Sequence, residues 1–137
     1  MPCIFNIFTD GGSRGNPGPA AIGIVIKSSS GSTIHSFGKT IGTTTNNIAE
    51  YQAVIAALEW LTANKQKGEF HFFSDSQLIV NQINGLWKIK DANLRQKIIF
   101  LRGLEAQLQG VIKYTYIPRE KKSASDRLVN LSLDQQI

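Results

Sequence analysis

The sequence has few of the features that mark a secreted, membrane-bound or cysteine-rich protein. Its 137 residues include one cysteine, Cys3, which excludes an intrachain disulfide and a metal site built from several cysteines. No apolar run approaches the ~20 residues that a membrane-spanning helix requires, and residues 1–3 lack the charged start of a secretion signal. We therefore expect a protein of the reducing cytoplasm, with no membrane partner.

Acidic residues are also scarce, at ten Asp and Glu against fifteen Lys and Arg. The resulting formal net charge of +5 favours a polyanionic partner, because Lys and Arg side chains displace counterions from phosphates. An ordinary basic protein has a similar balance, so the charge alone does not decide the function. A few carboxylates placed together would still form a small acidic pocket for metal on a surface that attracts nucleic acid.

The length suits one domain covering residues 1–137, with a core of its own. Apolar spacing predicts elements in the order β-β-β-α-β-α-α-β-α. Strands are expected at residues 4–8, 20–26, 33–41, 70–73 and 111–117, and helices at 46–63, 76–83, 91–109 and 123–133. Strands linked by short turns form an antiparallel meander, and strands joined through helices run parallel. The expected fold is therefore α/β, a mixed sheet with helices on its faces.

The stretch IFNIFTDGGSRGNPG at residues 4–18 changes character abruptly. An apolar strand ends there, and Asp10 opens a glycine-rich loop. A carboxylate in this place lies beside the core and faces solvent, where α/β sheets usually keep their functional residues. Asp followed by Gly is also a favoured turn pair, so this stretch alone leaves a plain turn open.

Three further acids fall at the ends of expected elements. Asp75 follows an apolar strand, Glu50 lies in the first turns of the long helix, and Asp126 opens the last helix. Asn46 and Asn47 precede Glu50 by four and three residues, which places them on the same helix face. Each acid also has a structural explanation, as an N-cap for Asp75 and as a helix-dipole partner for the other two. Four such positions in one chain favour a shared site.

Four short motifs follow one another on the expected elements. They are TDGGSRGNPG at residues 9–18, TNNIAEY at 45–51, SDSQ at 74–77 and ASDRLVN at 124–130. Through these motifs the sequence resembles the type 1 ribonuclease H family over nearly the whole chain. The resemblance implies a five-stranded mixed sheet, three antiparallel strands then parallel strands, with the first strand near its centre. It also implies that Asp10, Glu50, Asp75 and Asp126 converge as one catalytic, metal-binding cluster.

The resemblance further implies an endonuclease that hydrolyses the RNA strand of RNA/DNA hybrids. Four carboxylates repel one another unless cations neutralise them, and oxygen-only ligands select Mg²⁺ or Mn²⁺. Two such ions ~4 Å apart clamp a phosphodiester, one activating water and the other stabilising the leaving 3′ oxygen. The products carry 5′-phosphate and 3′-hydroxyl ends. In this family scheme Asp10 bridges both ions, with Glu50 and Asp75 on one side and Asp126 on the other.

Neutral polar residues beside the acids are the expected substrate contacts. In the proteins that this chain resembles, ribose 2′ hydroxyls are contacted from the positions of Gly15, Asn16, Asn46, Asn47 and Gln77. Carboxamides suit this task, because a 2′ hydroxyl and a carboxamide each both donate and accept. By the same resemblance, Thr45 and Asn47 hold a phosphate of the DNA strand.

Two segments depart from the fuller members of the family. Residues 83–95 are too short and too weakly basic to form the basic protrusion by which some members grip the hybrid, so the chain resembles a short form. Within them, Trp87 and its neighbouring lysines would contact the DNA strand, although a buried tryptophan beside solvated lysines is the open alternative. The loop at residues 118–123 lacks the histidine that assists proton transfer or product release in many members, and Glu120 would take its place.

Other functions that the same fold supports make distinct predictions. Proofreading-type 3′ exonucleases have an Asp-x-Glu pattern on the first strand, and Gly12 at the third position argues against them. A catalytically weak or inactive hybrid- or RNA-binding module stays open, although a polyanion-binding site would gain by losing the four acids. Cleavage of double-stranded RNA also stays open, because it uses the same ribose contacts. We expect the protein to act as a monomer.

Overall fold

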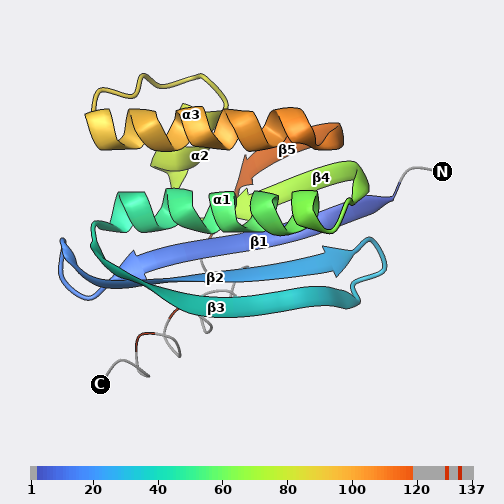
Figure 1. Ribbon diagram of the computed structural model, residues 1–137, viewed down its shortest axis with the longest axis horizontal. Coiled ribbons are helices and arrows are strands. Elements are labelled where there is room, and N and C mark those ends of the chain that lie inside the picture. The colour runs from blue at the N-terminus through green and yellow to red at the C-terminus, as the bar shows by residue number, and fades with distance from the viewer. Residues whose placement is uncertain (1–2, 119–128, 130–132, 134–137) are drawn as a thin grey trace.

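The computed structural model describes residues 3–118, Val129 and Leu133, and these form a five-stranded mixed sheet with helices (Figure 1). The strands are β1 (Ile4–Ser13), β2 (Gly18–Ser28), β3 (Thr33–Thr44), β4 (Lys67–Ser74) and β5 (Gln109–Tyr116). Their order is β3-β2-β1-β4-β5, with β1, β2 and β3 antiparallel in turn and with β4 and β5 parallel to β1. This arrangement confirms the expected fold class and the central place of the first strand.

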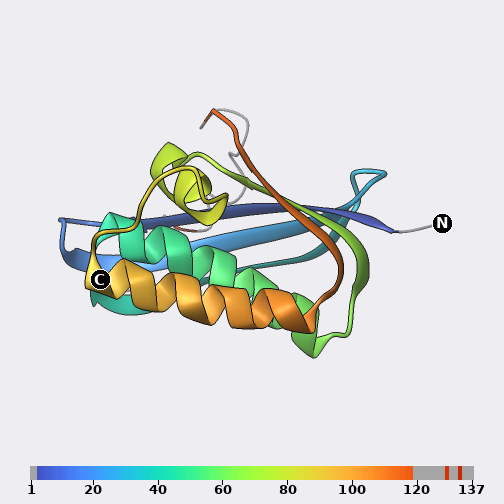
Figure 2. The same cartoon turned by 90° about the horizontal axis from the view of Figure 1, so that it is seen from above.

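The described helices cover one face of the sheet, and they are α1 (Asn46–Ala63), α2 (Gln77–Ile83) and α3 (Ala92–Gln107). α1 lies between the sheet and α3 (Figures 1 and 2). Because it is covered on two sides, α1 is apolar around most of its surface and not along one narrow stripe. Within the described part of the chain, no helix has the length and apolar character needed to cross a membrane.

Side-chain caps fix where α1 and α2 begin. At the start of α1, Thr45 Oγ1 accepts a hydrogen bond from the Ile48 N–H at 3.3 Å. At the start of α2, Ser76 Oγ accepts from the Ile79 N–H at 3.3 Å. The cap of α2 is therefore Ser76, and the structural explanation that the sequence left open for Asp75 is wrong.

β1 continues well beyond the predicted strand end at residue 8. Its antiparallel pairing with β2 runs as far as Ser13 with Ala20, whereas its parallel pairing with β4 stops at Phe8 with Phe73. Asp10 thus lies inside a strand and does not open a loop. The reason is that β2 supplies ladder hydrogen bonds to a Gly-Gly sequence that would not form a strand by itself.

Val129 and Leu133 lie on the face of the sheet opposite α1. They are buried together with Ala21, whereas the neighbouring Ile22 belongs to the core on the α1 side. Adjacent residues of a strand point to opposite faces, so the two clusters are separated by the sheet. Both residues belong to the helix predicted at 123–133, whose other members lie outside the described residues.

Candidate active site

Three of the predicted acids meet at one place. Asp10 on β1, Glu50 on α1 and Asp75 after β4 each bring one carboxylate oxygen within 4.8 Å of the other two. Asp10 is 3% exposed and Glu50 8% exposed, while Asp75 is half-buried. Buried carboxylates this close together repel unless hydrogen bonds or a bound cation compensate. The set of oxygen donors fits a hard divalent cation.

The register of two parallel strands places Asp10 beside Asp75. The ladder between β1 and β4 ends with the pair of Phe8 and Phe73, and each acid follows two residues later in its own strand or turn. The two phenylalanine rings stack with their centroids 5.2 Å apart, which fixes this pair just before the acids. Because the pairing of β1 with β4 ends at this one pair, the strand register sets how far apart the two carboxylates lie.

Gly11 holds Glu50 in the cluster. Its backbone N–H donates to Glu50 Oε1 at 2.6 Å. A Cβ at this position would lie 2.2 Å from the carbonyl carbon and oxygen of Ala49 and 2.6 Å from the backbone nitrogen of Glu50, so glycine is required for α1 to lie this close to β1. The sequence indicated only a turn glycine here, because a single sequence carries no signal of a helix that approaches a strand.

Two carboxamides fasten the glycine-rich loop to the start of α1. Asn46 Oδ1 accepts from the Ser13 N–H at 2.9 Å and from the Ser13 hydroxyl at 3.0 Å, and the Asn46 N–H donates to Asn16 Oδ1 at 3.0 Å. Because both amide oxygens act as acceptors here, the Nδ2 groups of Asn16 and Asn46 are the donors that these side chains present. Gly15, between Arg14 and Asn16, has a φ of 97°, which favours glycine.

An open depression of about 460 Å³ surrounds the acids. Its described lining residues are Asp10, Gly11, Gly12, Ser13, Arg14, Asn46, Asn47, Glu50, Asp75, Ser76, Val129 and Leu133. Arg14 is the single basic side chain in this set, and it was not among the residues predicted from the sequence. An exposed arginine in a loop carries no signal that distinguishes it from other surface charges.

The predicted substrate contacts fall in two groups. Asn46 and Asn47 belong to the wall of the depression. Gly15, Asn16, Thr45 and Gln77 adjoin wall residues in the sequence, and Asn16 is also bonded to Asn46. Asp126 and Glu120 lie outside the described residues, so the roles assigned to them stay predictions.

Trp87 lies at the surface between α2 and α3. Its side chain is 48% exposed, and that of the preceding Leu86 is 72% exposed. Lys88 and Lys90 are exposed as well. The alternative of a buried tryptophan is therefore wrong, and an exposed aromatic ring stands beside two positive charges.

Comparison with known sequences gives relatives over nearly the whole chain. Residues 8–132 match the family described as Reverse transcriptase-like. The chain is 43% identical to Ribonuclease HI of Halobacterium salinarum over 129 residues, which are 93% of this chain and 63% of that protein. It is 39% identical to Bifunctional protein Rv2228c of Mycobacterium tuberculosis over 129 residues, 93% of this chain and 35% of that one. The chain thus spans less than two thirds of the length of these curated relatives.

Solved structures match the fold closely. RNase H1 of Halobacterium salinarum superposes with a TM-score of 0.91 at 40% identity, and the match covers 96% of this chain and 98% of that one. LC11-RNase H1 in complex with an RNA/DNA hybrid superposes with a TM-score of 0.92 at 41% identity, with the same coverage. The N-terminal RNase H domain of Rv2228c gives a TM-score of 0.90 at 35% identity, covering 97% and 95% of the two chains.

Proposed function

Since this chain belongs to the Reverse transcriptase-like family and, within it, to the type 1 ribonucleases H, we propose that it is an endonuclease that hydrolyses the RNA strand of RNA/DNA hybrids. The observation that carries the proposal is the convergence of Asp10, Glu50 and Asp75 in an open depression. The complex of its relative LC11-RNase H1 with an RNA/DNA hybrid supports the choice of substrate. All three described acids come from one chain, so a monomer suffices for this part of the site.

The carboxylates are the groups that would hold the metal. Asp10, Glu50 and Asp75 supply oxygen donors within 4.8 Å of one another, and Asp126 is the predicted fourth ligand. The chemistry supplied by two bound Mg²⁺ or Mn²⁺ ions is activation of the attacking water and stabilisation of the leaving 3′ oxygen, which yields 5′-phosphate and 3′-hydroxyl ends. The chain's own contribution is rigid placement, because Asp10 is held in a paired strand and Glu50 accepts from the Gly11 N–H.

Recognition of RNA would rest on the carboxamides. Asn16 and Asn46 both use their oxygens within the protein, which leaves their Nδ2 groups as the donors for a substrate. A ribose 2′ hydroxyl accepts such a bond, whereas a deoxyribose leaves the donor without a partner. Asn47, Gly15 and Gln77 complete the proposed set of ribose contacts. Double-stranded RNA offers the same hydroxyls, which supports its cleavage as a second activity.

The DNA strand would contact α1 and the segment that follows α2. Thr45 Oγ1 accepts from the Ile48 N–H, so its hydroxyl hydrogen stays available to donate to a phosphate of the DNA strand. The side chain of Asn47 is proposed to contact the same phosphate. Trp87 offers an exposed ring for packing against the sugars of the DNA strand, with Lys88 and Lys90 beside it for phosphates. Glu120 stays the proposed substitute for the missing loop histidine.

The direct test is a substrate panel. Labelled RNA/DNA hybrid, duplex RNA and duplex DNA of one sequence are incubated with the protein and Mg²⁺ or Mn²⁺, and the cut strand and its ends are identified. We expect internal cuts in the RNA strand of the hybrid with 5′-phosphate ends, and intact duplex DNA. Hybrid that binds but is never cut with either metal would favour a binding module, and cut duplex DNA would contradict the ribose contacts.

Hybrid binding should weaken steeply with salt. Each phosphate neutralised by Lys or Arg contributes roughly 0.9 log units of affinity per log unit of salt. Replacing Lys88 with Met should therefore lower the measured slope by about one such contact. The matched control is Lys67→Met, because Lys67 begins β4 at the end opposite Asp75 and should leave the slope unchanged. Affinity that is insensitive to salt would contradict the phosphate contacts.

A further inference from the structure

The segment of residues 86–90 between α2 and α3 presents its exposed side chains at a specific end of the molecule. Leu86 and Trp87 are 72% and 48% exposed, and Lys88 and Lys90 are exposed too. Figures 1 and 2 both show the connection from α2 to α3 at the end where α1 begins. The start of α1 carries residues of the acidic depression, so the backbone of the segment and the depression lie toward the same end of the molecule.

Side chains of α2 and α3 hold this segment and the end of α2 by hydrogen bonds to backbone carbonyls. Three side chains donate to them: Arg102 Nη2 to Ile83 O, Gln82 Nε2 to Lys88 O at 3.4 Å, and Arg95 Nε to Ile89 O at 2.7 Å. The Asn81 carbonyl also accepts from the N–H groups of Leu86, at 2.8 Å, and Trp87, at 3.2 Å. α2 has only about two turns, and a helix this short is not stable alone. The end of α2 and the segment that follows it therefore depend on contacts of this kind.

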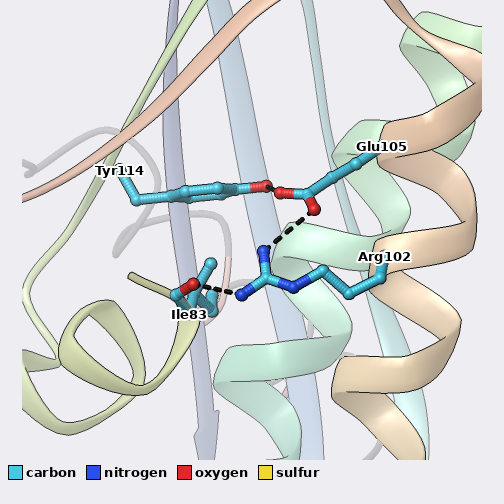
Figure 3. Close-up of polar contacts among 4 residues, drawn as sticks. All are labelled: Ile83, Arg102, Glu105 and Tyr114. Carbon is cyan, nitrogen blue, oxygen red and sulfur yellow. Dashed lines mark hydrogen bonds and ion pairs between the residues drawn. The ribbon is translucent and has the colours of Figure 1, made fainter. Parts of the chain in front are cut away.

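Arg102 joins the end of α2 to α3 and β5 (Figure 3). Its Nη1 donates to Glu105 Oε1 at 2.9 Å, and the hydroxyl of Tyr114 on β5 donates to Glu105 Oε2 at 2.7 Å. Burial, followed by the charge of Glu105, raises the pKa of Tyr114 far above its usual value, so this hydroxyl remains a neutral donor. Asn84 Nδ2 donates to the Tyr114 carbonyl at 3.0 Å and ties α2 to the same strand.

Gln82 connects the same segment to α1. The hydroxyl of Tyr51 donates to Gln82 Oε1 at 2.7 Å, and both residues are buried. Burial, opposed by the charge of Arg102, raises the pKa of Tyr51 to about 12, which keeps its hydroxyl a neutral donor as well. Because Tyr51 directly follows Glu50 on α1, these bonds fix the position of the segment relative to the helix that carries one of the acids.

We propose that Arg102 and Gln82 are positioning residues that hold Trp87 at a fixed place relative to the acidic depression, for contact with the DNA strand of the hybrid. The inference rests on the proposed function, since it takes the hybrid as the ligand. Arg102 and Gln82 do not touch the substrate. They reduce the conformational freedom that the 86–90 segment would otherwise lose on binding, and this preorganisation increases affinity.

A double-mutant cycle on hybrid binding tests this proposal. The dissociation constant of a labelled RNA/DNA hybrid is measured in EDTA by fluorescence anisotropy, so that no cleavage occurs. Loss of one exposed aromatic contact weakens binding about tenfold, which we expect for Trp87→Ala because its ring would pack against sugars of the DNA strand, and Arg102→Met should weaken it several-fold. Since both changes remove the same contact, the double variant should lie within about twofold of Trp87→Ala alone.

Controls separate positioning from loss of charge or of stability. Lys67→Met removes one positive charge at the far end of β4 and should leave binding within about twofold. Arg102→Lys keeps the charge but lacks the guanidinium fork, so it should restore only part of the affinity. Asn84→Ala removes the hydrogen bond from the exposed Asn84 to the Tyr114 carbonyl and should also weaken hybrid binding. This variant tests the proposal if Arg102→Met does not fold.

Kinetics give the second readout. In the cleavage assay Arg102→Met should raise KM and leave kcat within about twofold, because it acts on binding and not on the carboxylates. Multiplicative effects in the double variant, or unchanged binding by both Arg102→Met and Asn84→Ala, would overturn the proposal. A wild-type protein that binds hybrid without cutting it would refute the proposed activity, and the binding cycle would still decide the positioning role.

Discussion

Replacing Asp10 with Asn is expected to lower kcat for hybrid cleavage by at least about 10³-fold. The Asp10 side chain is 3% exposed and brings one carboxylate oxygen within 4.8 Å of oxygens of Glu50 and Asp75, so the variant removes one of the three negative charges described in the cluster. Asn has nearly the same shape but no charge, so it would weaken the proposed metal site without opening a cavity. Cleavage of labelled hybrid in Mg²⁺ and in Mn²⁺ measures the effect, and hybrid binding should stay within a few-fold of wild type.

A thermal melt gives a readout of the same variant that does not depend on activity. In EDTA, Asp10→Asn should melt at a higher temperature than wild type, because one of three mutually repelling carboxylates has lost its charge. Added Mg²⁺ should stabilise wild type by mass action and stabilise the variant much less. Asp91→Asn is the matched control, since Asp91 caps α3 and Asn is an equally good cap. Wild-type cleavage by Asp10→Asn would contradict the assignment of the acidic cluster.

Replacing Gly11 with Ala should lower the free energy of unfolding by about 3 kcal/mol or more. The new Cβ would lie 2.2 Å from the carbonyl carbon and oxygen of Ala49 and 2.6 Å from the backbone nitrogen of Glu50. All three are main-chain atoms, so no side chain can rotate away and α1 must move from β1. That movement also breaks the hydrogen bond between the Gly11 N–H and Glu50, and activity should fall with stability.

Urea unfolding followed by far-ultraviolet circular dichroism measures this loss. The control is Gly12→Ala, because among the described residues a Cβ there would meet the Val129 side chain, at 3.6 Å, which is an ordinary contact. We expect that variant to differ from wild type by less than about 1 kcal/mol, since Ala is at least as good as Gly within a strand. Equal stability of the two variants would contradict the close approach of α1 to β1.

Periodicity and the motifs were sufficient to predict the architecture and the family. The five strands and the first three helices occur at the expected places, and the order β3-β2-β1-β4-β5 confirms a central first strand. This succeeded because apolar spacing reflects which face of each element is buried, and that is a local property of the sequence. The acids could be singled out because the sequence placed each one near the end of an expected element, although Asp10 in fact lies inside β1 and Glu50 lies beyond the first turn of α1.

Only the tertiary structure decided the features that depend on contacts between distant segments. β1 extends through Asp10 to Ser13 because β2 pairs with it, and Gly11 is required because α1 crosses there. Likewise, the exposure of Trp87 and the bond from Arg102 to the end of α2 follow from how α2 and α3 pack. A pattern in one sequence shows which residues are apolar or charged, whereas the space beside each atom is set by elements that meet only in the folded chain.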